Sequence, residues 1–161
     1  MALVSQAQDF GLESVGGRIG LSPNQHGRDF RQAEGFVNCN LPWKWDLAKE
    51  WYLQSRLDFS AGWLANSVDD AAVFTTGPSF LVGRQRLPFS FEVGFSPTLL
   101  SNHDFGTRNF GTPFQFTSHF GLNWDLGHFR VGYRFQHMSN ADISQNNPGL
   151  SMQMVALSYR F

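Results

Sequence analysis

The segment Phe89-Ser90-Phe91-Glu92-Val93-Gly94-Phe95-Ser96 alternates large apolar side chains with small or polar ones at every position. Successive side chains of a β-strand point to opposite faces, so this period of two predicts a strand with one apolar face and one polar face. The same period recurs at residues 129–135, where Phe, Val, Tyr and Phe alternate with Arg, Gly and Arg. We therefore expect a chain built from two-faced strands.

Outward from this segment, the alternation predicts eight strands. They cover residues 15–21, 32–41, 51–63, 72–82, 89–96, 114–124, 128–136 and 152–161, of which 32–41 shows the weakest pattern. Short connections are expected at 83–87 and 125–127, and long loops rich in Asn, Gly and Pro at 97–112 and 140–150. Segment 42–50 is long for a short-side turn. One strand with its connection in about 20 residues is typical of the smallest membrane β-barrels.

The composition also favours a membrane barrel. Charged residues make up only 16% of the 161 residues, equal to the aromatic share, and Lys44 and Lys49 are the only lysines. Such a chain cannot easily cover a water-exposed surface, and it has no apolar run long enough for a membrane helix. A formal net charge of -1 argues against a nucleic-acid partner. The single cysteine, Cys39, excludes an internal disulfide.

Alternation alone does not say which face points inward, because a soluble barrel that carries an apolar ligand alternates as well. The polar face here has small residues and scattered charges but no lysine, and the apolar face is too bulky for an eight-stranded interior. We therefore expect the aromatic side chains to face lipid, in an all-β, eight-stranded antiparallel up-and-down transmembrane β-barrel. The inward charged residues are expected to pair as a structural plug, since buried charges need partners. They are Arg18, Glu34, Arg56, Asp58, Glu92, Arg130, Arg134 and Arg160, with His119 as a hydrogen-bonded member.

Two polar residues, His137 and Ser139, continue the lipid-facing side of the seventh strand. Side chains two residues apart share a strand face, so an imidazole lies beside a hydroxyl. Enzymes that use a serine nucleophile and a histidine base place an imidazole beside a hydroxyl in this way. A simpler interpretation is that both residues lie in the interfacial zone, where a polar group costs only about 0–1 kcal/mol.

The residues that follow this pair suit an ester-cleaving site. Asn140-Ala141 and the segment Asn146-Asn147-Pro148-Gly149 contain residue types that permit the tight backbone needed to aim N–H groups at an oxyanion. If the first strand starts in the periplasm, the seventh strand ends at the outer leaflet. An acyl ester of a glycolipid could enter the site sideways there.

The segment Phe135-Gln136-His137-Met138-Ser139-Asn140-Ala141, the later Asn147-Pro148-Gly149-Leu150 and the ending Ser158-Tyr159-Arg160-Phe161 resemble the PagL family of lipid A 3-O-deacylases. The resemblance implies an eight-stranded outer-membrane barrel that hydrolyses the acyl ester at position 3 of lipid A without a metal or other cofactor. It carries the roles of base and nucleophile onto His137 and Ser139. It also implies that Asn147 shapes the loop behind the oxyanion site.

One position departs from the family pattern, which has a Glu twelve residues after the serine to orient the histidine. Here that position is Ser151, which has the parity to face outward beside His137. A hydroxyl can fix the tautomer of an imidazole but cannot neutralise the imidazolium that forms during acyl transfer. The sequence therefore predicts a slower His–Ser dyad, help from another acid, or an inactive protein; Asp142 is the nearest carboxylate.

Three functions follow from these patterns: a lipid A esterase, a non-catalytic outer-membrane barrel for adhesion or membrane integrity, and a soluble carrier. The resemblance favours the first, with catalytic residues Ser139, His137 and Ser151 and support from Asn140, Ala141, Asn147 and Gly149. Its expected partners are lipopolysaccharide and outer-membrane lipids, and whether it forms homodimers stays open. We expect one domain, 1–161, in which 1–14 is an N-terminal segment. Ser5-Gln6-Ala7 resembles the end of a signal peptide.

Overall fold

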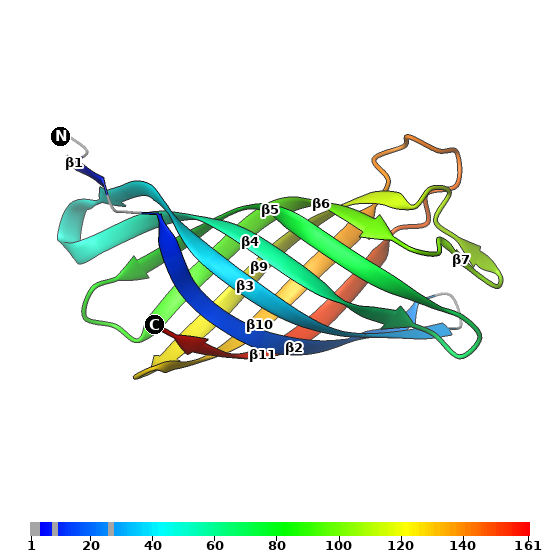
Figure 1. The fold of residues 1–161 in the computed structure, drawn as a ribbon, viewed down its shortest axis with the longest axis horizontal. Helices are drawn as coiled ribbons and strands as arrows, with labels where there is room; N and C mark the ends of the chain where they lie inside the picture. The colour runs from blue at the N-terminus through cyan, green and yellow to red at the C-terminus, as the bar shows by residue number, and fades with distance from the viewer. Residues whose placement is uncertain (1–3, 8–9, 26–27) are drawn as a thin grey trace.

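Eight long antiparallel strands close into a barrel in the computed structural model, which describes residues 4–7, 10–25 and 28–161 (Figure 1). These strands are β2 (Gly11–Gln25), β3 (Arg28–Asp46), β4 (Trp51–Ala65), β5 (Asp70–Arg84), β6 (Phe89–Leu100), β9 (Phe114–Leu126), β10 (Phe129–Ser139) and β11 (Leu150–Arg160). Each pairs with its neighbour in the order β2-β11-β10-β9-β6-β5-β4-β3, and β3 closes the barrel on β2. The prediction of an all-β, eight-stranded antiparallel barrel is confirmed.

Short elements complete the chain. They are β1 (Val4–Ala7), which pairs with the end of β3, the 3-10 turn η1 (Ala48–Glu50), and a small hairpin of β7 (Asp104–Phe105) and β8 (Arg108–Asn109). No helix in the described ranges is long and apolar enough to span a membrane. Residues 1–3 and 8–9 of the predicted N-terminal segment lie outside the described residues, and its assignment as a leader remnant stays a prediction.

Several predicted boundaries are wrong. The first strand, expected at 15–21, is β2, which runs from Gly11 to Gln25. The second strand, expected at 32–41, is β3, the longest strand at 19 residues, because pairing with β4 resumes at Lys44 after a bulge and the end of β3 also pairs with β1. The loop expected at 97–112 begins only after Leu100 and contains the β7–β8 hairpin. Pro97 is tolerated in β6 because pairing with β5 lapses between Gly94 and Thr98, where the missing N–H is not needed.

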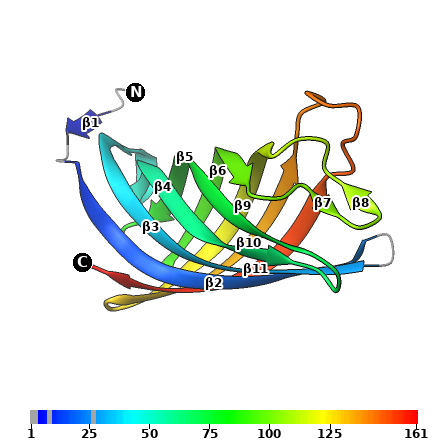
Figure 2. The ribbon, with the colours of Figure 1, turned by 45° about the vertical axis from the view of Figure 1, so that its right-hand side comes forward.

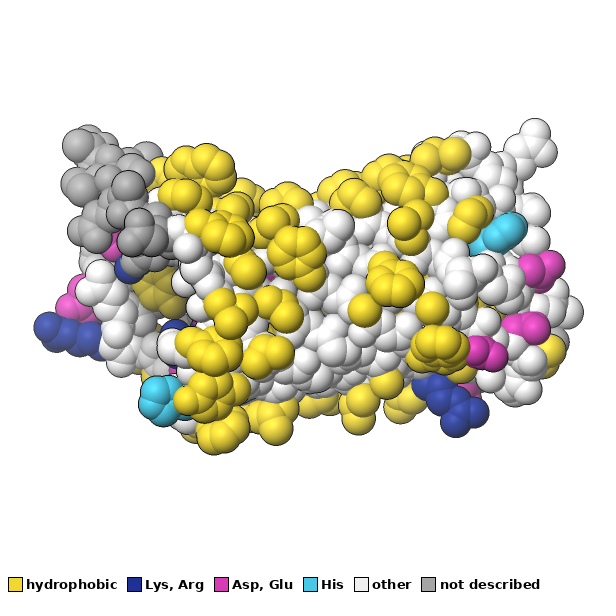
Figure 3. Space-filling model, in the orientation of Figure 1, with side chains coloured by type: hydrophobic (Ala, Val, Ile, Leu, Met, Phe, Trp, Pro, Cys, Tyr) yellow, Lys and Arg dark blue, Asp and Glu magenta, His cyan; other side chains and the backbone are white. Residues whose placement is uncertain are grey.

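The two faces of the barrel wall differ as the alternation predicts. In β6 the Phe91 side chain is 57% exposed on the outside, whereas Glu92 is 7% exposed in the lumen. Figure 3 shows apolar side chains spread over the barrel wall and charged side chains at its two ends. An apolar outer band with a polar interior is the pattern of barrels that lie in lipid.

The lumen holds a network of ion pairs that confirms the predicted polar plug. Glu92 accepts hydrogen bonds from Arg56 and Arg134, and Arg18 pairs with Glu34. Nearer one end, Arg130 lies 2.9 Å from Glu13 and 2.6 Å from Asp125. Arg160 differs from the prediction, because its side chain is 34% exposed at the rim, where it pairs with Asp125 at 2.9 Å.

The two rims of the barrel are unlike each other. The chain ends, η1 and the short turns after β5 and β9 lie at one rim (Figure 1). The β7–β8 hairpin and the loop between β10 and β11 rise together from the other rim (Figure 2). Beneath them lies a buried apolar cluster that includes Phe30, Phe105 and Phe110, whose ring centroids are 5.3–5.9 Å apart. The end of β10 that carries His137 is at this loop-bearing rim.

Candidate active site

His137 faces outward near the end of β10, between two neighbouring strands. The strand register pairs it with Ser151 of β11 on one side and with Ser118 of β9 on the other. Its Nδ1 lies 2.9 Å from the Ser151 hydroxyl oxygen. With the proton on Nδ1, the ring donates to Ser151 and Nε2 keeps its lone pair. Nε2 is therefore the nitrogen available to act as a base.

Ser139 is the last residue of β10 and shares the outward face with His137. Its side chain is half-buried, and within the described residues it forms no hydrogen bond to the His137 ring. Hydrogen bonds between catalytic groups are often long or misaligned without substrate, so this geometry suits a nucleophile and base that align when substrate binds.

Ser118 is a neighbour of His137 that sequence reasoning missed. It lies on the exposed face of β9, in register with His137, between the apolar outward residues Phe116 and Phe120. The sequence did contain a sign of Ser118, because this serine takes an outward position in the alternation of β9. Only the register of β9 against β10 brings it beside the imidazole.

Gly149 lies directly against the His137 ring. A Cβ at this position would come within 2.8 Å of the ring Cε1 and 3.2 Å of Nε2, and the backbone has φ of +59°. Both the close approach and the left-handed backbone require glycine. The predicted support residue Gly149 therefore forms one wall of the imidazole site.

The loop after β10 opens with a tight turn. Ala141 and Asp142 have φ of 51° and 62°, and the Ile143 N–H donates to the Asn140 carbonyl at 3.1 Å. Positive φ at both central residues defines a type I′ turn. Non-glycine residues adopt this backbone at a cost, and such strain clusters at functional sites.

Two asparagines hold this loop together. The fully buried Asn140 side chain donates to the carbonyls of Phe110 at 2.9 Å and Asn146 at 2.7 Å, and its backbone N–H donates to Asn147 Oδ1 at 3.0 Å. Asn147 in turn donates to Asp142 at 2.8 Å. The N–H groups of Asn140 are thus occupied. In the described part of the chain, the backbone N–H of Ala141 has no such partner.

No carboxylate among the described residues contacts His137. Asp142, the nearest acid in sequence, is exposed and accepts the hydrogen bond from Asn147 instead. The hydrogen-bond partner that orients the ring at Nδ1 is therefore Ser151 and not an acid.

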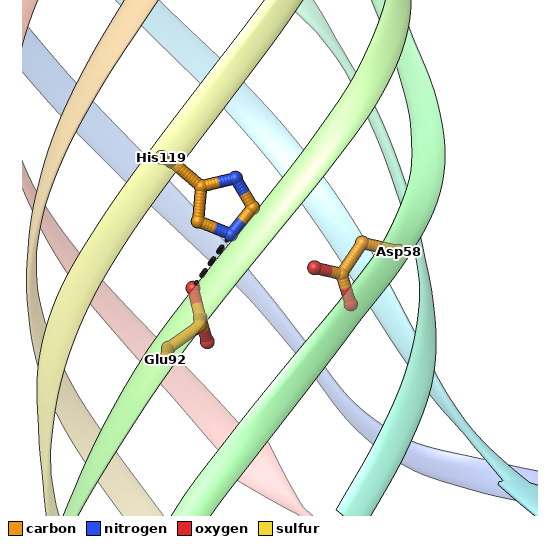
Figure 4. A group of neighbouring side chains, drawn as sticks. All are labelled: Asp58, Glu92 and His119. Carbon is orange, nitrogen blue, oxygen red and sulfur yellow. Dashed lines mark ion pairs between the residues drawn. The ribbon is translucent and has the colours of Figure 1, made fainter.

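A separate group in the lumen has ligand types that metals use. Asp58, Glu92 and His119 bring their ligand atoms within 4.8 Å of one another, and His119 Nε2 lies 3.3 Å from Glu92 (Figure 4). Glu92 is already paired with Arg56 and Arg134. Two guanidinium groups oppose a further cation, so this group fits the structural plug and lies on the opposite face of the wall from His137.

The fold and this site together define a small β-barrel protein with a candidate serine-esterase site on its outer wall. A family model described as lipid A 3-O-deacylase (PagL) matches residues 32–160. The chain belongs to this family, and the match includes His137, Ser139 and Ser151.

Two relatives agree with this assignment. The lipid A deacylase PagL of Bordetella bronchiseptica is 38% identical over 74 residues, which are 45% of this chain and 42% of that protein, so the alignment spans less than half of the relative. A crystal structure of the outer membrane enzyme PagL superposes with a TM-score of 0.80 at 16% identity, covering 92% of this chain and 99% of the other. The latter likeness shows the shared fold.

Proposed function

We propose that the protein is an outer-membrane esterase that removes the acyl chain at position 3 of lipid A. Support comes from membership of the PagL family and from the apolar outer wall of the barrel. The observation that carries the proposal is the 2.9 Å contact between His137 Nδ1 and Ser151, on the same outward face as Ser139. It orients the imidazole and leaves Nε2 available for the serine.

In the proposed reaction, Ser139 Oγ attacks the ester carbonyl carbon while His137 Nε2 takes the hydroxyl proton. The tetrahedral intermediate collapses, the ester C–O bond breaks, and the imidazolium protonates the departing sugar oxygen, which leaves as a hydroxyl. Water, deprotonated by His137, then cleaves the acyl-serine ester and releases a fatty acid. The free N–H of Ala141 is our candidate donor to the oxyanion.

We propose that the loop-bearing rim faces the cell exterior. Long loops lie outside in outer-membrane barrels, whereas the short turns face the periplasm. His137 and Ser139 then lie at the level of the outer leaflet, where the ester of a lipid A molecule reaches the wall from the side. Lipopolysaccharide is the proposed substrate.

The alternative is a non-catalytic barrel, and one observation favours it. No carboxylate of the described residues contacts His137, so nothing there neutralises an imidazolium. In serine proteases, disabling the triad acid costs about 10⁴ in rate. Because the chain belongs to the PagL family, we propose that this observation indicates an esterase that is slower than relatives with an acid at this position.

The test is release of free fatty acid from purified lipopolysaccharide by the wild type, Ser139→Ala and His137→Asn. We expect release only from the wild type. Heat-modifiable gel migration confirms that each barrel is folded. Equal release from all three proteins would reject the esterase function and leave the non-catalytic barrel.

A further inference from the structure

We propose that Arg108 is a positioning residue that holds Gly149 against the His137 imidazole. Arg108 lies in the β7–β8 hairpin, far from His137 in sequence, and no motif points to it. The inference rests on the proposed ester hydrolysis, because it assigns a role in orienting the proposed base.

Arg108 donates hydrogen bonds to the backbone carbonyls on both sides of the Gly149 Cα. Its Nη2 donates to the carbonyl of Gly149 and, at 3.4 Å, to that of Pro148. The side chain is buried, with 7% of the residue exposed, and its guanidinium carbon lies 5.6 Å from the ring centroids of both Phe30 and Phe110. Burial lowers the pKa of Arg108, yet a guanidinium keeps its proton in proteins, so these are charge-assisted hydrogen bonds.

The segment that Arg108 holds forms the wall of the imidazole site. A Cβ on Gly149 would lie 2.8 Å from His137 Cε1 and 3.2 Å from Nε2, so the ring lies over the position that a larger side chain would occupy. Ser151 holds the ring at Nδ1. The hydrogen bond at Nδ1 and the glycine near Nε2 together fix the ring rotation, and with it the direction of the Nε2 lone pair.

Other contacts join the hairpin segment to the loop between β10 and β11. Asn140 donates to the Phe110 carbonyl at 2.9 Å. Gly111 lies so close to the loop that a Cβ there would come within 2.3 Å of the Asn146 carbonyl oxygen. The hairpin segment and the loop between β10 and β11 thus pack as one unit. Within this unit, Arg108 is the hairpin residue that contacts Gly149, the glycine beside His137.

Loss of Arg108 is expected to change turnover more than substrate binding. The buried guanidinium does not reach the outer wall, so it does not contact a lipid there. A misplacement of about 1 Å in a catalytic group can cost about 100-fold in rate. We expect Arg108→Met to lower kcat by about 10- to 100-fold with KM within about twofold of the wild type.

The experiment compares the full chain in detergent as wild type, Arg108→Met, Arg108→Lys and Arg86→Met, with purified lipopolysaccharide as substrate. Arg86 is 83% exposed in the turn after β5, at the opposite rim, and is the matched control. We expect partial recovery of kcat in Arg108→Lys, which restores a cationic donor, and no change in Arg86→Met. If Arg108→Met does not fold, Arg108→Gln replaces it with the same expected results.

The NMR signal of the His137 Cε1–H provides a readout besides activity. We expect Arg108→Met to shift this signal while the His119 signal in the lumen stays in place. A wild-type His137 signal with wild-type kcat, or a raised KM at unchanged kcat, would overturn the positioning role. If the wild type releases no more fatty acid than Ser139→Ala, the proposed function fails, and the His137 signal still decides whether Arg108 positions the ring.

Discussion

At the scale of single residues, the site depends on what holds one imidazole. Ser151 occupies the position beside His137 Nδ1, at 2.9 Å, and no described carboxylate takes part. A hydroxyl can accept a hydrogen bond from Nδ1–H and so select the tautomer, but it carries no charge to stabilise an imidazolium. Ser151 therefore orients the His137 imidazole but does not stabilise its charged form.

Ser151→Glu is expected to raise kcat by about tenfold or more, because the carboxylate adds the charge that serine lacks. The measurement is fatty-acid release from lipopolysaccharide with folding checked by gel migration. Gln153→Glu is the control, since Gln153 is exposed on the same face of β11 and adds the same charge at a different register position. An unchanged or lower rate in Ser151→Glu would contradict the assignment of this position to a supporting acid.

At the scale of elements, hydrogen bonds of a buried asparagine hold the loop between β10 and β11 in shape. Asn140 is fully buried and its side-chain amide and backbone N–H bind three separate oxygens, two of which belong to the same loop. The left-handed backbone at Ala141 and Asp142 opposes this order. The loop therefore keeps its shape only while the asparagine contacts persist.

Asn140→Ala is expected to loosen this loop and make it a faster target for a protease. The change removes the donor to the Asn146 carbonyl and leaves the buried Phe110 carbonyl with Gln115 alone, and a lost hydrogen bond of this kind costs about 1–3 kcal/mol. Limited proteolysis with thermolysin, followed by mass spectrometry of the fragments, measures the rate of cleavage within 140–149. Gln145→Ala, an exposed change in the same loop, serves as the control. Equal cleavage rates in the two variants would argue against the bracing role of Asn140.

At the scale of the whole molecule, the barrel has its charge inside and its apolar surface outside. Glu92 is central to the interior, because it accepts hydrogen bonds from Arg56 and Arg134 and lies near His119. Arg56 has no exposed surface. The interior thus depends on balanced charge rather than on an apolar core at this level.

Glu92→Gln is expected to destabilise the barrel by about 3–5 kcal/mol, because it removes the closest carboxylate from the buried guanidinium groups of Arg56 and Arg134, whose other carboxylate contacts are at 3.8–4.0 Å. Urea unfolding in detergent, followed by tryptophan fluorescence, gives the free energy of unfolding. Glu50→Gln is the control, since Glu50 forms rim ion pairs with Arg84 and Arg86 that are about one-third exposed or more and are worth about 1 kcal/mol or less. Similar losses in the two variants would contradict the plug.

The number of strands, the polar lumen and the outward parity of His137, Ser139 and Ser151 followed from alternation in the chain. Parity is a local property: each backbone step turns the side chain to the other face, so neighbours in sequence suffice to predict it. The same reasoning misjudged residues 97–100, because they open a segment rich in Asn, Gly and Pro that suggested a loop, whereas pairing with β9 and β5 keeps them in β6.

The partners of the imidazole depended on tertiary structure. Ser118 reaches His137 through the register of β9, Gly149 reaches the ring through a left-handed turn, and Arg108 reaches Gly149 from a separate hairpin. These contacts join segments up to about 40 residues apart in the chain, as the 41-residue separation of Arg108 and Gly149 shows. Alternation fixes only the face on which a side chain lies. Which residues meet the ring depends on the register of β9 against β10 and, for Arg108, on the packing of the β7–β8 hairpin against the loop between β10 and β11.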